Sequence, residues 1–314
     1  MEIFELSLEM AEEAMRLLEE NYEEAKRMHG ILPEDVCIPS DPRLFQNGLG
    51  AAAFENGKMV GFLSGYGPWG PVFCTKDTKG VYSPLHAHAA VMENRKRIYQ
   101  RLYQAAAEKW VRAGAGCHTI SLYDPDDAAR EAFFEYGFGK RCADLICATE
   151  DKGIFPENAE CFILPKECGR EIRPLRAALA AHLEKSPCFM KSDAREKEAW
   201  ILKREKEPPR TFIARVNGRI AAYMEVTDDG ENFITGHPAM KNICGAYCLE
   251  EFRGKNVAAS LLGFVLKTLK SEKVPLLGVD CESINPTAIH FWKKHFSPYT
   301  QSLVRRIDEK AIPS

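Results

Sequence analysis

The chain repeats itself at an offset of about 160 residues, and this repeat limits the possible folds more than any single motif does. Asn56-Gly57 and Asn217-Gly218 lie 161 residues apart, and each pair separates two apolar runs. Asn-Gly between apolar runs is typical of a two-residue β-hairpin turn, because both turn positions need a positive φ. The sequence therefore predicts one antiparallel hairpin in each half of the chain.

Two further landmarks recur in the same order. The aromatic pattern of residues 133–138 (FFEYGF) returns in residues 291–296 (FWKKHF) at an offset of 158, and Arg95 and Arg253 are separated by the same 158 residues. Three ordered matches favour duplication over chance. A length of 314 residues, about twice that of a common domain, also favours two domains.

Both halves show the same order of elements, with a helix and a hairpin followed by strand, helix, strand and helix. The hydrophobic spacing predicts these elements at 7–29, 85–91, 95–113, 117–123, 126–136 and 142–148 in the first half, and at 175–183, 243–248, 257–269, 274–280 and 286–295 in the second. This order indicates an α/β (α+β) fold, with a mixed sheet flanked by helices in each half. We expect domains at 1–150 and 170–314, joined by a polar linker at 151–169.

The composition argues against several classes of protein. A formal net charge of −3 argues against a basic protein that coats nucleic acid, and no apolar run approaches the roughly 20 residues of a membrane span. The acidic N-terminus is unlike a signal peptide, so a cytoplasmic location is expected. The eleven cysteines are scattered without metal-ligand spacing, which predicts small buried residues and no metal site.

One loop carries the strongest chemical signal. A predicted strand ends near Cys248, and the connection from Arg253 to Ala258 leads directly into an apolar helix. Unpaired amides at a helix start, with two basic side chains beside them, can bind a phosphate or pyrophosphate. Asn256 stands where a left-handed conformation is expected, which Asn tolerates better than most residues. The alternative is a helix start that is basic for no functional reason. The loop residues proposed to bind the anion are Arg253, Gly254, Lys255, Asn256, Val257 and Ala258.

This loop resembles the acyl-CoA pyrophosphate loop of the GNAT superfamily of N-acetyltransferases, whose pattern is Arg or Gln, two residues, Gly, one residue, then Gly or Ala. Arg253 and Ala258 fit this pattern, whereas Asn256 stands where the family most often has Gly. Asn285 and the aromatic pair at 291–292 also follow the family's layout. The resemblance spans about residues 170–300 and implies two tandem GNAT-like domains, each with a mixed, mostly antiparallel sheet.

The resemblance also implies a cofactor site and its chemistry. Acetyl-CoA would be the co-substrate, held by the loop, by the end of the fourth strand at Tyr247, Cys248 and Leu249, and by Asn285 and Trp292. The family's usual general acid is a tyrosine, and the corresponding residue here is Trp292, which cannot supply a proton. Tyr299, Tyr247 or solvent would have to take that role.

A general base is needed to deprotonate the attacking amine. Glu225, Asp280 and Glu282 are the candidates, because Glu225 lies on the second strand of the hairpin and the other two close a buried strand. Each is equally compatible with a solvated strand-end carboxylate.

The first half resembles the same family with a degraded loop. Residues 94–100 (NRKRIYQ) offer no Gly or Ala where backbone must approach a phosphate, and the bulky Tyr99 lies near the helix start. We expect that this half does not bind CoA, and that Arg95, Lys96 and Arg97 form a solvated face.

Two functions remain open at this point. In the first, the second half acetylates an amine by direct attack, while the first half shapes the acceptor site or a homodimer. In the second, the protein binds CoA or another ligand as a sensor without turnover. The expected partner is a small-molecule or peptide amine, and neither nucleic acid nor a membrane is expected.

Overall fold

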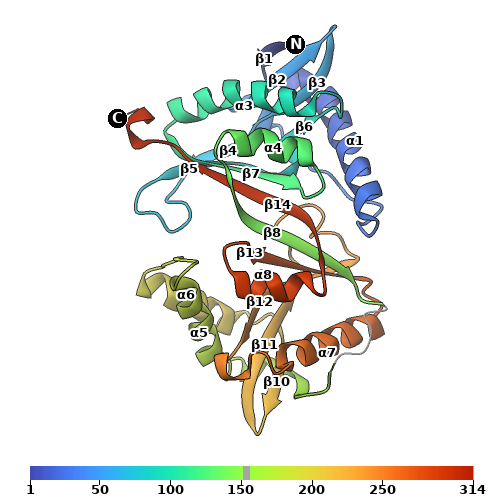
Figure 1. Cartoon of the computed structure of the whole chain (residues 1–314), viewed down its shortest axis with the longest axis vertical. Coiled ribbons are helices and arrows are strands. Elements are labelled where there is room, and N and C mark those ends of the chain that lie inside the picture. The colour runs from blue at the N-terminus through green and yellow to red at the C-terminus, as the bar shows by residue number, and fades with distance from the viewer. Residues whose placement is uncertain (151–155, 314) are drawn as a thin grey trace. The chain divides into compact units, whose positions relative to one another are not determined.

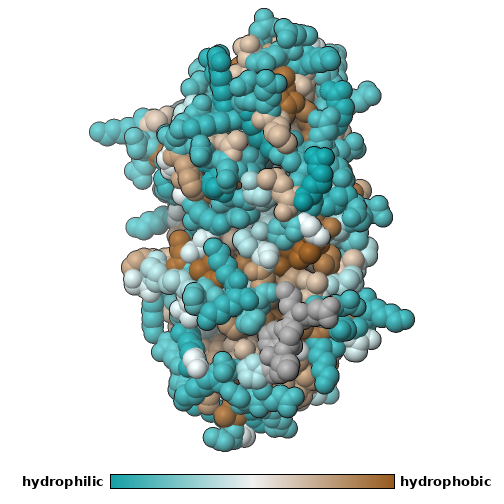
Figure 2. All heavy atoms as spheres, turned by 45° about the vertical axis from the view of Figure 1, so that its right-hand side comes forward, coloured by the Kyte–Doolittle hydropathy of each residue, from teal (hydrophilic) through white to brown (hydrophobic). Residues whose placement is uncertain are grey.

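The computed structural model describes residues 1–150 and 156–313. The chain divides into two compact units (Figure 1). Unit 1 contains Met1–Ala143 and Pro298–Ser314, and unit 2 contains Asp144–Ser297. Hydrophilic residues cover most of the face shown in Figure 2, with hydrophobic residues scattered among them.

Unit 1 contains a four-stranded sheet in the order β1-β2-β3-β6. Its strands are β1 (Glu2–Glu5), β2 (Ala51–Glu55), β3 (Lys58–Leu63) and β6 (His88–Ala90). Because side chains alternate along a strand, Ala51 and Ala53 face one hydrophobic core and Ala52 faces another. Helix α3 (Arg95–Arg112) packs in the first core and α1 (Ala11–His29) in the second, so helices cover both faces of this sheet.

A second group of unit 1 strands has the order β4-β5-β7-β14. These are β4 (Tyr66–Trp69), β5 (Lys79–Ser83), β7 (Ala115–Tyr123) and β14 (Ser297–Arg306), of which β5 and β7 are parallel. Helices α2 (Arg43–Gln46) and α4 (Asp127–Glu135) complete this unit, and β8 (Gly139–Ala148) leads out of it.

Unit 2 has strands in the order β13-β12-β11-β10-β9. They are β9 (Glu160–Leu164), β10 (Arg210–Val216), β11 (Arg219–Thr227), β12 (Met240–Cys248) and β13 (Leu276–Glu282). The helices are α5 (Arg173–Glu184), α6 (Ala194–Lys206), α7 (Val257–Ser271) and α8 (Pro286–Lys293). Ile213 packs with Leu175 of α5, and its neighbour Phe212 contacts Phe264 of α7, so the two helices cover opposite faces.

Five short 3-10 helices connect these elements: η1 (Leu8–Met10), η2 (Leu85–Ala87), η3 (Lys166–Cys168), η4 (Glu250–Phe252) and η5 (Glu309–Ala311). The strand expected at residues 85–91 is therefore only His88–Ala90, preceded by η2. Helix α6 was not expected from the sequence. It begins with a capping box between Asp193 and Glu196 but has a weak apolar stripe, with Ile201 as its buried residue.

The last strand of each sequence half, β8 or β14, contributes residues to the compact unit formed mainly by the other half. Strand β14 follows the second repeat, yet its residues from Pro298 belong to unit 1, where Thr300–Arg306 pair with β7. The end of β8 follows the first repeat, yet its residues from Asp144 belong to unit 2. Domain limits at 1–150 and 170–314 stay a prediction for the repeated segments, and the compact units differ from them by this exchange.

The expected linker at 151–169 falls partly outside the described residues, at 151–155. Within its described part, Glu160–Leu164 form β9 and pair with β10, and Lys166–Cys168 form η3. Strand β9 is an edge strand of unit 2.

Both expected hairpins are confirmed. Strands β2 and β3 meet at Asn56-Gly57, strands β10 and β11 meet at Asn217-Gly218, and all four turn residues have positive φ. The prediction of mostly buried cysteines was wrong, because only Cys117, Cys147, Cys188 and Cys281 of the eleven are buried and the others are partly or fully exposed. Within the described residues, no helix has the length and apolar content to cross a membrane, and no cluster of three potential metal ligands occurs.

Candidate functional site

Strands β12 and β13 are hydrogen-bonded to each other over only the first part of their length. Their parallel pairing runs from Met240 with Leu276 to Ile243 with Val279, and β12 then continues to Cys248 without a pair on β13. The separation begins at a β-bulge, since Glu225 of β11 pairs with Gly245 whereas Val226 pairs with Ile243. Cys244 is thus the extra residue. A bulge bends its strand and can end pairing, which explains why the strands separate here.

A cavity of about 310 Å³ lies in unit 2 at the separated end of β12. Eight residues expected to bind the cofactor line it: Tyr247, Cys248, Arg253, Gly254, Asn256, Val257, Ala258 and Asn285. Leu249, Lys255 and Trp292 are not among its lining residues. Trp292 is buried and packs against Phe296, and its neighbour Phe291 faces the cavity instead.

The start of α7 has the geometry of an anion site. Gly254 and Asn256 have φ of 73° and 62°, which confirms the expected left-handed conformation at Asn256. The Asn256 side chain makes no capping hydrogen bond. The first amides of a helix have no acceptor within it, so those of Val257, Ala258 and Ala259 remain available to a ligand in the cavity.

Arg253 is held against the wall of this cavity. Its Nε donates to the Cys248 carbonyl at 3.0 Å, and its guanidinium lies 5.1 Å from the centre of the Tyr247 ring. A cation fixed beside the helix start adds to the positive potential of the helix dipole.

Two residues that sequence reasoning missed also line the cavity. Nε2 of His182, on α5, lies 3.4 Å from Asn285 Oδ1, and the His182 ring lies in a tilted contact with the Tyr247 ring, with 6.1 Å between the ring centres. Tyr223 of β11 is fully buried beneath the cavity. Neither residue belongs to a recognisable motif, so only the packing of α5 and β11 reveals them.

The three expected catalytic residues have different environments. Glu225 is fully buried in ion pairs with Arg176 and Arg204 and does not line the cavity. Tyr299 is buried on β14 and belongs to unit 1. Asp280, at the end of β13, lines a second cavity in unit 2.

This second cavity measures about 970 Å³ and is polar. Trp200 of α6 forms part of its wall. The charged residues that line it are the acids Asp144, Glu207, Asp229, Glu231 and Asp280 and the cations Lys166, Lys203, Arg204 and Lys206. Partial desolvation and the charges of Asp280, Asp144 and Glu282 raise the pKa of Glu231 to about 7. Glu231 was not expected from the sequence, because it lies in the connection between β11 and β12.

The two cavities use consecutive stretches of β12. Asn242, Ile243 and Cys244 line the polar cavity, whereas Ala246, Tyr247 and Cys248 line the first one. Only Gly245 separates the two stretches.

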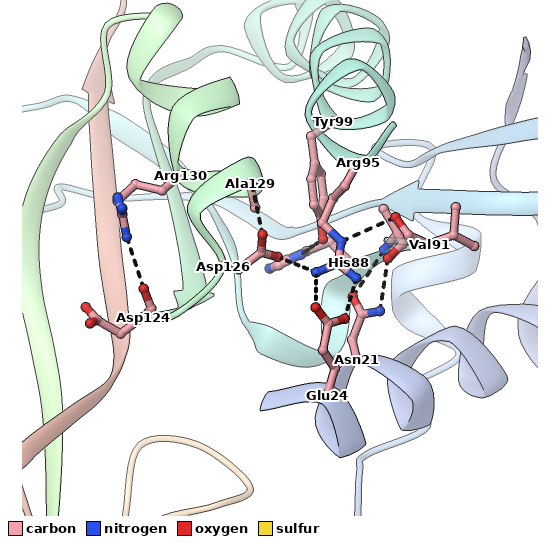
Figure 3. A network of polar contacts seen from close by, with 11 residues as sticks. Asn21, Glu24, His88, Val91, Arg95, Tyr99, Asp124, Asp126, Ala129 and Arg130 are labelled. Atoms are coloured by element: carbon pink, nitrogen blue, oxygen red, sulfur yellow. Dashed lines mark hydrogen bonds and ion pairs between the residues drawn. The ribbon is translucent and has the colours of Figure 1, made fainter. Parts of the chain in front are cut away.

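The corresponding part of unit 1 is filled by its own side chains (Figure 3). The N-cap of α3, Asn94, has the same left-handed conformation as Asn256, so Arg95 corresponds to Val257 and not to Arg253. Arg95 is buried, and its guanidinium contacts Glu24 at 2.6 Å and Asp126 at 3.1 Å. The expectation that it is solvated was wrong, because two carboxylates in the packed interior offset its desolvation.

A second polar contact closes the gap between strands β6 and β7 of unit 1. His88 of β6 lies 3.0 Å from the Tyr99 hydroxyl through Nδ1 and 2.7 Å from the Ser121 carbonyl through Nε2. In unit 2 the first cavity lies beside the end of β12 and the start of α7. Unit 1 therefore holds protein side chains where unit 2 leaves room for a ligand.

Comparisons with known proteins agree with this geometry. Residues 177–296 match a family model described as the Acetyltransferase (GNAT) family. These residues form a GNAT acetyltransferase domain. The GNAT domain includes the separated end of β12, the start of α7 and helix α8, which line the first cavity.

The fold likeness extends beyond the GNAT domain. A GCN5-related N-acetyltransferase from Sphaerobacter thermophilus has 12% identity and a TM-score of 0.56, with 99% of this chain and 98% of that chain covered. A GCN5-related glucosamine N-acetyltransferase region of a fungal multi-domain GH3 β-N-acetylglucosaminidase has 15% identity and a TM-score of 0.52, covering 96% and 38%. A comparison with curated proteins found no match. The expected fold class, α/β (α+β) with mixed, mostly antiparallel sheets flanked by helices, is confirmed. The tandem arrangement of two GNAT-like domains stays a prediction.

Proposed function

We propose that unit 2 is an acetyl-CoA-dependent N-acetyltransferase that transfers the acetyl group to an amine by direct attack. The observation that carries this proposal is the position of the two cavities on either side of Gly245. A thioester in the first cavity and an amine in the second would approach each other at the bulge. Such alignment of two reactants supplies much of the rate enhancement in transfer reactions.

Different parts of the first cavity would bind different parts of the coenzyme. The amides at the start of α7, together with Arg253, would bind the diphosphate. The apolar length of the cavity beside Ala222 and Met224 would accept the pantetheine arm. Free backbone amides of the separated end of β12 would then donate to the thioester, whose carbonyl oxygen gains negative charge during attack.

The second cavity suits the amine. Its carboxylates would attract a protonated amine, and one of them would take the proton that the amine must lose before or during attack. Asp280 and Glu231 are the proposed bases, and Glu231 is favoured by a pKa near neutrality. The carbon–sulfur bond then breaks, and the thiolate leaves with its electron pair and takes a proton from solvent or from a tyrosine such as Tyr247.

We assign no transfer chemistry to unit 1. The buried contacts of Arg95 and His88 favour a structural role for this unit, which agrees with the degraded loop expected from the sequence. We retain a cytoplasmic location and a small-molecule or peptide amine as the partner.

The experiment that tests the proposal measures thiol release from acetyl-CoA across a broad panel of amines. Turnover with at least one amine is expected, together with its loss in Arg253→Glu. The matched control is Arg195→Glu, which makes the same charge change at an exposed position of α6 outside both cavities. CoA binding without turnover on the whole panel would instead support a sensor that binds CoA without catalysis.

A further inference from the structure

One arginine of helix α6 reaches the bulge that separates β12 from β13. Arg204 donates through Nη1 to Glu225 Oε2 at 2.8 Å and through Nη2 to the Cys244 carbonyl at 3.1 Å. Its Nη1 also lies 3.1 Å from the Cys244 sulfur. Since Cys244 is the extra residue of the bulge, Arg204 contacts the residue that directly follows the last pair between β12 and β13.

Glu225 makes this contact rigid. Its other oxygen accepts from Arg176 Nη2 at 2.5 Å, and the carboxylate has no exposed surface. A Cβ atom placed on Gly245 would lie 2.8 Å from Glu225 Oε2, so the carboxylate is packed directly against the strand. The bulge is thus enclosed between a fixed carboxylate and a forked guanidinium.

Loss of the hydrogen bond from Arg204 to the Cys244 carbonyl would change the pairing of β12. A buried carbonyl without its hydrogen bond is destabilising, and a strand can recover that loss by returning to regular pairing. Regular pairing beyond Ile243 would bring Cys244 toward Asp280 and close the space that the first cavity needs. The far end of the cavity, at the start of α7, would keep its own geometry because it is set by Gly254 and Asn256.

We infer that Arg204 is a positioning residue, which through Glu225 and Cys244 holds β12 apart from β13. It thereby presents to the thioester the amides of Ala246 and Cys248, which point away from β11. This inference rests on the proposed function. It assigns a task to Glu225 that differs from the general base expected from the sequence. It also explains why a fully buried carboxylate stands next to a catalytic strand.

The test compares two ligands that use different parts of the first cavity. ADP would contact only the start of α7, whereas acetyl-CoA would also need the separated end of β12. In Arg204→Met we expect the Kd of ADP to stay within about twofold, and that of acetyl-CoA to rise about tenfold, as expected for loss of well-placed donors. The kcat with any accepted amine should fall about 100-fold, because small displacements of reacting groups have effects of this size.

Arg195→Met is the matched control, since it removes the same charged group from the same helix outside both cavities. Arg204→Lys serves if the methionine variant does not fold. A lysine can reach Glu225 but lacks the fork that also serves Cys244, so it should recover stability without recovering acetyl-CoA affinity.

Equal weakening of ADP and acetyl-CoA, or no change in either, would overturn the inference. A wild-type protein that binds acetyl-CoA and never turns over would overturn the proposed function instead, and the two binding measurements would still decide the role of Arg204.

Discussion

Nη2 of Arg176 lies 2.5 Å from Oε1 of Glu225, and neither side chain is exposed to solvent. Breaking a buried ion pair typically costs about 3–5 kcal/mol. Without Arg176, Glu225 would keep its ion pair with Arg204, which offsets only part of the lost contact. We expect Arg176→Met to lower the free energy of unfolding by this amount in urea denaturation. The double variant Arg176→Met/Glu225→Gln should lose less than the sum of its two single variants. A loss below about 1 kcal/mol in the single variant would contradict this prediction.

The left-handed conformation of Asn256 predicts how the start of α7 tolerates substitution. Asn256→Gly should keep stability and CoA affinity, because glycine adopts positive φ without a steric cost. Asn256→Val should lose about 1–2 kcal/mol of stability, since a branched side chain is strained in this region. Thermal unfolding with and without CoA measures both effects. Equal behaviour of the two variants would show that the backbone here is not constrained.

Glu231 predicts a pH dependence of the transfer reaction. Its carboxyl has a pKa raised to about 7 in the folded protein, so it becomes a competent base as the pH rises through 7. In the wild type, kcat/KM should rise as the pH increases through 7. Glu231→Gln should lower kcat/KM and remove this rise from the pH profile. Two amines of different basicity separate the titration of the enzyme from that of the substrate. A limb that moves with the amine and persists in Glu231→Gln would contradict the prediction.

The same shift has a consequence for stability, with a definite sign. Because folding raises this pKa above its usual 4.5, the folded state holds a proton that the unfolded state has released. The contribution of Glu231 is fully present below pH 4.5 and is lost as the pH rises through about 7. Glu231→Gln should therefore flatten the fall in stability between these values, as measured by urea denaturation at a series of pH values.

His88 predicts that unit 1 is sensitive to acid. Burial lowers the pKa of His88 to about 4, so the unfolded state takes up a proton first as the pH falls below 6.5. Stability present above pH 6.5 should be lost toward pH 4, with a slope of at most about 1.4 kcal/mol per pH unit for this group. His88→Gln should reduce the slope. His118, whose pKa is also lowered to about 4 by burial, should retain the remainder.

Local features could be predicted well because neighbouring residues decide them. The two Asn-Gly turns, the helix starts at Arg95 and Val257, and the left-handed Asn256 follow from backbone preferences within a few residues. The anion loop could be located for the same reason. The sequence landmarks did misplace one correspondence, because Arg95 matches Arg253 in the letters but Val257 in the fold.

Contacts between distant segments could not be predicted in this way. Helix α6 has too few buried residues for a clear apolar stripe, yet it supplies Arg204, which lies 21 positions from Glu225. The roles of Glu225 and Arg95 depend on whether a partner of opposite charge lies beside them after folding. The sequence around a strand carboxylate is the same whether the folded protein places that carboxylate beside solvent, a substrate or two arginines.

From its sequence alone, this protein could be recognised as a repeated, hairpin-bearing α/β chain with an anion-binding helix start, since turn and cap chemistry acts over a few residues. Only the folded chain decided that the residues of β14 from Pro298 join unit 1, that a bulge forms at Cys244, and that neighbouring stretches of β12 line two different cavities. These outcomes depend on packing and desolvation, which are properties of residues brought together from far along the chain.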